Sequence, residues 1–198
     1  MSASARLPVL SCAEAAAAEA AFLAGDTKLS WELMNRAARG VGDEARALLG
    51  RKPGRILILA GKGNNGADAF LAALHCARPG TEIVAVFAEG GPSRPQAQRA
   101  WSVRKQGVRI GIVAAANLRK LAAHEFCLIF DGILGQGFRA PLSAELRRFL
   151  RDTDKLQGLR IAVDLPSGLG DDATGPAFRA DLTVSIGCLK RPLLAPQA

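Results

Sequence analysis

Six short apolar segments recur along the chain after residue 54, and stretches with helical periodicity separate them. The apolar segments are rich in β-branched residues, which is typical of strands buried on both faces of a sheet. Alternation of such strands with helices predicts a mainly parallel sheet covered on both sides, with right-handed crossovers. We expect strands at 55–60, 82–88, 108–114, 126–131, 159–164 and 182–187, and helices at about 66–78, 93–106, 117–123 and 142–153.

Two further helices are expected before the first strand. The alanine-rich stretch 13–25 consists of strong helix formers and ends at Gly25. In the stretch 30–49, apolar residues recur at helical spacing, and Ser30 is placed to cap the first turn. A dehydrogenase domain normally opens with the strand that carries its glycines, so two helices before the first strand do not favour a dehydrogenase.

Composition indicates an ordinary globular protein. The chain has 198 residues, of which 49% are hydrophobic and 22% charged, enough for one domain that covers residues 1–198. No apolar run approaches the roughly 20 residues that cross a membrane. Glu14 and Glu19 interrupt the apolar stretch nearest the first residue, so no signal peptide is expected and the cytoplasm is the expected location.

The formal net charge of +8 suits an anionic partner. The basic residues are scattered, and the chain contains no tyrosine, so a nucleic-acid groove is disfavoured. The four cysteines are far apart and form no C-x-x-C pair, which favours buried, reduced thiols over zinc sites or disulfides.

The first strand of the sheet leads into LAGKGNNGADAF, residues 59–70, whose three glycines spell G-x-G-x-x-G. Glycines between a strand and a helix let backbone N–H groups approach a phosphate at the helix N-terminus. The order of a P-loop is absent, which disfavours that kind of ATP hydrolysis. Turn formation explains a single asparagine here. Because two asparagines and an aspartate occur together, ligand contact is the favoured interpretation for Asn64, Asn65 and Asp68.

Two later strands also end in polar loops. Asp131 opens DGILGQGFRAPL, which offers a second candidate phosphate-binding loop at 135–141 before a helix that should start near Pro141 or Leu142. Asp164 closes the next strand and precedes Pro166 and Ser167; capping of this turn is the alternative role for Asp164. The last strand is followed by Lys190. Since ligands bind beyond the carboxyl ends of parallel strands, these loops are expected to form one site.

A cation site is a further expectation from these loops. Oxygen ligands from Asn65, Asp131 and Ser167 would carry only one negative charge. Such a set suits a weakly charged, hard ion better than zinc or iron. The residues themselves do not distinguish K⁺ from Na⁺.

Three motifs carry a family resemblance. GKGNNGADAFLAALH, DGILGQGFRAPL and VDLPSGLGDDATG, in this order, resemble the signatures of the YjeF N-terminal domain family, which comprises NAD(P)H-hydrate epimerases. The resemblance covers about residues 10–192 and implies a Rossmann-like three-layer α/β/α sandwich, usually a homodimer. The implied activity interconverts the R and S epimers of hydrated NADH and NADPH (NADHX and NADPHX). A dehydratase, to which this domain is fused in many bacteria, can then repair the S form.

The resemblance also implies roles for individual residues. One K⁺ per subunit would be bound by Asn65, Asp131 and Ser167. Position and chemistry suggest Asp164 as the catalytic acid/base, with Asp68 as the second choice. Contacts to the substrate are implied for Asn64, Asn65, Gly66, Ala67, Asp68, Gly135, Gln136, Gly137, Phe138, Arg139, Ala140, Pro141 and Asp164.

Ala67 departs from the family pattern, which has glycine at this position. Alanine costs on the order of 1 kcal/mol if the backbone there needs a positive φ. It is harmless if the residue lies in the first turn of a helix.

Other functions stay open. One alternative is a non-catalytic nucleotide-binding, RNA-binding or dimerisation module of the same fold. Another is an NAD-dependent dehydrogenase, which rests on the glycine motif and on Glu89 at the end of the second strand. For a homodimer, apolar residues of the first two helices are the expected contacts: Leu29, Trp31 and Leu33.

Overall fold

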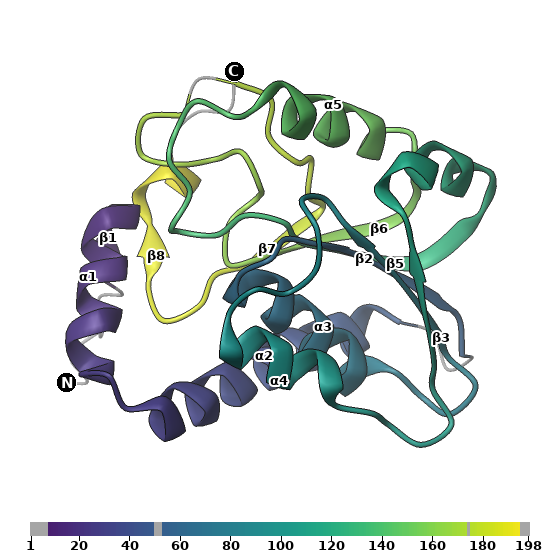
Figure 1. Ribbon diagram of the computed structural model, residues 1–198, viewed down its shortest axis with the longest axis horizontal. Coiled ribbons are helices and arrows are strands. Elements are labelled where there is room, and N and C mark those ends of the chain that lie inside the picture. Colours follow the sequence, from purple (N-terminus) through teal and green to yellow (C-terminus); the bar gives the residue numbers. More distant parts are fainter. Residues whose placement is uncertain (1–7, 50–52, 174, 195–198) are drawn as a thin grey trace, which may run out of the picture.

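The computed structural model describes residues 8–49, 53–173 and 175–194. Six parallel strands form one sheet in the order β4-β3-β2-β5-β6-β7 (Figure 1). The order places the strand before the glycine motif at the centre, beside the strand that ends in Asp131. The strands are β2 Arg55–Ala60, β3 Glu82–Phe87, β4 Arg109–Val113, β5 Glu125–Gly132, β6 Gln157–Val163 and β7 Leu182–Val184.

Helices cover both faces of this sheet. Alternate residues of β2 point to opposite faces, so Ile58 packs in one core cluster and Leu59 in the other. In the view of Figure 1, α5 lies above the sheet and α2, α3 and α4 lie below it. The expected three-layer α/β/α arrangement is confirmed. The helices are α1 Cys12–Leu23, α2 Thr27–Leu48, α3 Asn64–Cys76, α4 Pro95–Ser102 and α5 Ala144–Thr153, with 3₁₀ segments η1 Ala115–Ala123 and η2 Arg191–Leu194.

Some expected boundaries were wrong. Helix α2 begins at Thr27 because the side chain of Asp26, not Ser30, accepts the N–H groups of Lys28 and Leu29 at 2.8 and 2.9 Å. Helix α3 begins two residues before its expected start. The segment expected as a helix at 117–123 is a 3₁₀ segment, and β7 and α4 are shorter than expected.

A small second sheet was not expected. Strand β1, Val9–Leu10, pairs in parallel with β8, Leu189–Lys190. Two-residue strands leave no periodic pattern, so the sequence carried no signal for them. Asp171 also contacts the N-terminus of α1: its carboxylate accepts the N–H groups of Cys12 and Ala13 at 2.8 and 3.1 Å. The first helix is thereby attached to the loop that follows β6.

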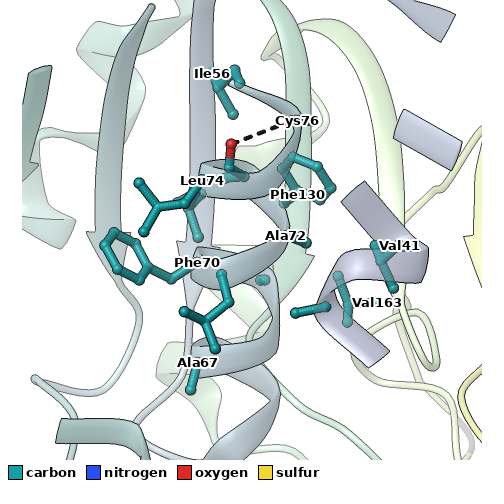
Figure 2. Packing of buried hydrophobic residues seen from close by; sticks show 14 of the residues in the cluster. Val41, Ile56, Ala67, Phe70, Ala72, Leu74, Cys76, Phe130 and Val163 are labelled. Atoms are coloured by element: carbon teal, nitrogen blue, oxygen red, sulfur yellow. Dashed lines mark hydrogen bonds between the residues drawn. The ribbon is translucent and has the colours of Figure 1, made fainter. Parts of the chain in front are cut away.

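Helix α3 is almost wholly buried between the sheet and its neighbouring helices. Phe70 stacks on Trp101 with ring centroids 4.1 Å apart. Figure 2 shows Phe70, Leu74 and Ala67 along this helix, among core residues from other elements, and Cys76 near its end. This packing fixes the direction of α3, and therefore the position of its N-terminus at the edge of the sheet.

All four cysteines lie in the described residues and are free thiols. Burial raises the pKa of Cys12 to about 11 and that of Cys76 to about 12. The expectation of buried thiols is confirmed for these two. No helix in the described ranges is long and apolar enough to cross a bilayer.

Candidate functional site

The two asparagines of the glycine motif are the first residues of α3, and Gly63 is its N-cap. Among the described non-glycine residues, only Ala24 and Asp164 have a positive φ. A left-handed turn therefore does not explain either asparagine. The Oδ1 atom of Asn64 is buried and has no hydrogen-bond partner in the described part of the protein. An unpartnered amide at a helix N-terminus is what a ligand-binding position would leave.

Ala67 also lies in α3 and is fully buried, with no positive φ. Position 67 therefore has a helical backbone and does not need the positive φ that would strain an alanine. Alanine therefore stabilises the helix here instead of straining it.

Glycines bring the first two loops into contact. A Cβ on Gly61 would lie 1.9 Å from the carbonyl oxygen of Ile133, and one on Gly66 would lie 2.4 Å from the carbonyl oxygen of Gly61. A side chain at Gly61 would push the two loops apart, and one at Gly66 would open the turn that leads into α3. The motif thus serves close approach of the α3 N-terminus to the loop after β5.

Asp131 and Ser167 meet beside this contact. The Asp131 carboxylate accepts the Ser167 N–H at 2.7 Å and its hydroxyl at 2.5 Å, and it also accepts the Ile133 N–H at 3.2 Å. The Ser167 Oγ accepts the Leu134 N–H at 2.8 Å. The Asn65 Nδ2 donates to the Leu134 carbonyl oxygen at 2.7 Å. The three predicted cation ligands are therefore brought together around Leu134, whose carbonyl is a fourth oxygen that the sequence could not reveal.

The chemistry of this cluster fits a monovalent cation. Asp131 is fully buried, and it forms no ion pair with the described residues. Burial raises the pKa of its carboxyl group to about 6, against the hydrogen bonds from Ser167. One carboxylate with hydroxyl, amide and carbonyl oxygens is a hard, singly charged donor set. No group of three His, Cys, Asp or Glu side chains suited to a metal ion occurs in the described ranges.

Asp164 has an unusual backbone and an anchored side chain. Its φ is 71°, and its N–H donates to the Val184 carbonyl oxygen at 2.9 Å. Its Oδ1 accepts the Ile186 N–H at 3.0 Å and a contact from the Lys190 ammonium. Its Oδ2 forms no hydrogen bond with the described residues. One oxygen is thus held while the other is available to a ligand. A non-glycine residue in this strained conformation is typical of functional sites.

Asp68 has a contrasting environment. Its Oδ1 is buried and has no hydrogen-bond partner among the residues described. Burial raises the pKa of its carboxyl group well above the usual value, and the nearby negative charges of Asp164 and Glu19 raise it further. Asp68 and Asp164 are therefore close enough to interact electrostatically.

Asp68→Asn is expected to change how stability depends on pH. A carboxyl whose pKa is higher in the folded than in the unfolded state stabilises most at low pH, and that contribution is lost as pH rises from about 4 through the folded pKa. Urea unfolding should therefore show the variant to be more stable than the wild type at about pH 8, with a smaller difference at about pH 5. Identical pH dependence in the two proteins would contradict the buried environment of Asp68.

The loop 135–141, the second predicted loop, contacts both the start of α3 and the loop after β6. A Cβ on Gly135 would lie 3.2 Å from the Asn65 side chain, and one on Gly170 would lie 3.3 Å from the Phe138 ring. Gln136 Nε2 donates to Glu19 of α1, a contact that the sequence did not reveal. The loop also leaves exposed Gly137, Arg139, Ala140 and Pro141.

The expected helix start near Pro141 or Leu142 was too early in the chain. Helix α5 begins at Ala144, because the Ser143 hydroxyl accepts the Leu146 N–H at 3.1 Å. The Arg139 guanidinium donates to the carbonyl oxygens of Gln136 and Phe138 at 3.2 and 2.9 Å, so it stabilises its own loop.

Known proteins resemble this chain in sequence. The family model described as YjeF-related protein N-terminus matches residues 30–192. An NAD(P)H-hydrate epimerase of Rhodopirellula baltica is 34% identical over 164 residues, which cover 80% of this chain and 66% of that protein. An NAD(P)H-hydrate epimerase of Clavibacter michiganensis is 36% identical over 195 residues, covering 92% and 81%.

Longer relatives and a solved structure match as well. The bifunctional NAD(P)H-hydrate repair enzyme Nnr of Hyperthermus butylicus is 32% identical over 176 residues, and the chain covers only 32% of its length. The crystal structure of yeast ynu0 has a TM-score of 0.78 at 20% identity, covering 92% of this chain and 82% of that one, and so has the same fold. The extent of the family match and the identity to its members establish that the chain belongs to the YjeF-related N-terminal family.

Proposed function

We propose that this chain is an NAD(P)H-hydrate epimerase, which interconverts the R and S epimers of hydrated NADH and NADPH. The observation that carries the proposal is the pair of Asp68, near the start of α3, and Asp164, directly after β6: the Asp68 Oδ1 is buried without a hydrogen-bond partner among the described residues, and Asp164 lies beside an ammonium group. Relatives named NAD(P)H-hydrate epimerase support it.

The chemistry of epimerisation explains the need for two carboxyl groups. The reacting carbon bears a hydroxyl and the ring nitrogen, so loss and re-addition of the hydroxyl inverts the centre. Asp68, whose carboxyl pKa is raised by burial, is assigned as the acid that donates a proton to the departing hydroxyl, which leaves as water. The Asp164 carboxylate is assigned as the base that accepts a proton from the water that adds, and as the group that stabilises the cationic intermediate. The proton that Asp164 takes up must return to Asp68, through water in the site, before the next turnover, and no redox step is involved.

The remaining site residues are assigned to binding. The backbone N–H groups and the asparagine side chains at the start of α3, together with the loop 135–141, are assigned to the nucleotide part of the substrate. Contacts are proposed for Asn64, Asn65, Gly66, Ala67, Gly135, Gln136, Gly137, Phe138, Arg139, Ala140 and Pro141. K⁺ would be held by Asn65, Asp131 and Ser167, where it supplies positive charge next to the buried carboxylate.

Assembly and location complete the proposal. A homodimer through α1 and α2 is consistent with the exposed Phe22, which is 65% accessible, and with the half-buried Leu29, Trp31 and Leu33. Cooperation with a dehydratase, as a separate or fused protein, follows from bifunctional relatives such as the enzyme of Hyperthermus butylicus. The proposed location is the cytoplasm.

The test uses hydrated NADH enriched in the R epimer, followed by chromatography as it approaches equilibrium. The protein should accelerate this approach over the spontaneous rate, and more so in K⁺ than in Na⁺ buffer. Equal rates in both salts would contradict the K⁺ site while leaving the epimerase proposal standing. No acceleration in either salt would contradict the epimerase and favour the binding-module alternative. A spectral change at the nicotinamide band would instead favour the dehydrogenase.

A further inference from the structure

Lys190 is a charged residue inside the protein. Its exposed fraction is 1%, although lysine is one of the residues least often buried. It lies in β8, the short strand beside β1 and α1 in Figure 1. Its Nζ contacts two acceptors, the Asp164 Oδ1 and the Ile186 carbonyl oxygen. Both of its contacts are therefore at the candidate site.

The surrounding backbone is built to bring Lys190 back to Asp164. The chain turns tightly between β7 and β8: Gly187 has a φ of 77°, the Cys188 N–H donates to the Ile186 carbonyl oxygen at 2.9 Å, and the Ser185 hydroxyl donates to the Cys188 carbonyl oxygen at 2.7 Å. The Ile186 N–H also donates to the Asp164 Oδ1. Two donors from this one turn and its following strand thus converge on a single carboxylate oxygen.

Stability alone is a poor explanation for this ion pair. Removing two charges from water is costly, and apolar residues of similar size often replace a buried ion pair without loss. A buried pair is better explained where it fixes the orientation of a carboxylate that takes part in binding or catalysis. Here the pair leaves Oδ2 of Asp164 without a hydrogen bond to the described residues, while Oδ1 cannot rotate away.

We propose that Lys190 is a positioning residue, which holds the Asp164 carboxylate with one oxygen anchored and the other directed to the ligand. The inference deepens the proposed epimerase function and rests on it for its kinetic readout. Lys190 does not exchange a proton with the substrate. It acts through Asp164, by fixing its orientation and by placing a positive charge beside it.

The kinetic test compares Lys190→Met, Lys190→Ala and the exposed control Lys120→Met. Lys190→Met keeps much of the side-chain volume but removes the charge. We expect its kcat to fall at least tenfold while KM changes less than threefold, and Lys120→Met to match the wild type. Ethylammonium in the buffer should restore part of the activity of Lys190→Ala, and ethanol should not. Wild-type kcat in Lys190→Met, or equal rescue by ethanol, would overturn the proposal.

A stability measurement separates this inference from the epimerase proposal. Lys190→Met leaves a buried carboxylate unpaired, and Asp164→Asn leaves a buried ammonium unpaired, so each should lower the urea midpoint. The variant that combines both substitutions should lose less than the sum of the two single decreases in the urea midpoint. If the two decreases in the urea midpoint were additive, the ion pair would be disproved, whatever the effect of the variants on activity. If the wild-type protein accelerates no epimerisation but the losses are non-additive, the epimerase proposal fails and the anchoring of Asp164 stands.

Discussion

Asp164→Asn should lower the rate of epimerisation by about 10²- to 10⁴-fold, the usual contribution of a positioned acid or base. Asparagine is the sharpest replacement, because it tolerates the left-handed backbone at φ 71° and retains the shape of the side chain. It can still accept the Ile186 N–H. The loss would therefore be attributable to the missing charge and proton acceptor, with no backbone strain added.

The control for this variant is Asp172→Asn, which makes the same chemical change at an exposed position of the same loop. It should retain the wild-type rate. Urea unfolding of both variants would identify any contribution from misfolding, since Asp164→Asn leaves Lys190 without its partner. A fully active and folded Asp164→Asn protein would exclude Asp164 from catalysis.

Gly61→Ala should destabilise the protein by about 3 kcal/mol or more, since backbone overlaps at a packed position are rarely relieved. The added methyl group would lie 1.9 Å from the Ile133 carbonyl oxygen, which belongs to the loop that also holds Leu134. Relief requires the α3 N-terminus and that loop to separate, which would also disturb the oxygen cluster around Asp131. The free energy of urea unfolding measures the loss of stability, and K⁺ stimulation of the rate measures the disturbance of the oxygen cluster.

Gly40→Ala is the matched control, with the opposite expected sign. Gly40 lies within α2, and a Cβ there would meet no atom within 4 Å. Alanine should therefore stabilise the helix by about 1 kcal/mol. If Gly61→Ala unfolded at the same midpoint as the wild type, the close contact between the two loops would be disproved.

The sequence predicted most of the sheet because its strands are continuous apolar runs. It also indicated that the loops after β2, β5 and β6 converge, since carboxyl ends of parallel strands share one edge. It could not predict that the Leu134 carbonyl joins the oxygen cluster around Asp131, because every residue has a carbonyl group and only the fold selects one. Nor could it predict the approach of Glu19 to Gln136, which depends on where α1 packs.

The N-cap of α2 could not be predicted for a different reason. Ser30 and Asp26 are both good capping residues, and helical periodicity alone does not fix the first turn. Asp26 is the cap because the chain leaves α1 through Ala24, whose φ is 44°, and through Gly25, whose φ is 80°. Local competition between two plausible caps is thus decided by the preceding turn.

The contacts of β1 and Asp171 with distant parts of the chain bear on the order of folding. The Asp171 carboxylate and the Cys12 N–H are 159 positions apart, and Leu10 pairs in register with Lys190. Contacts between such remote segments carry a high loop-closure cost and form late. During synthesis, the large sheet can assemble from β2 to β6 before the ribosome has released Lys190. The anchored carboxylate is therefore among the last features to form, and a nascent chain with a complete core still lacks a finished site.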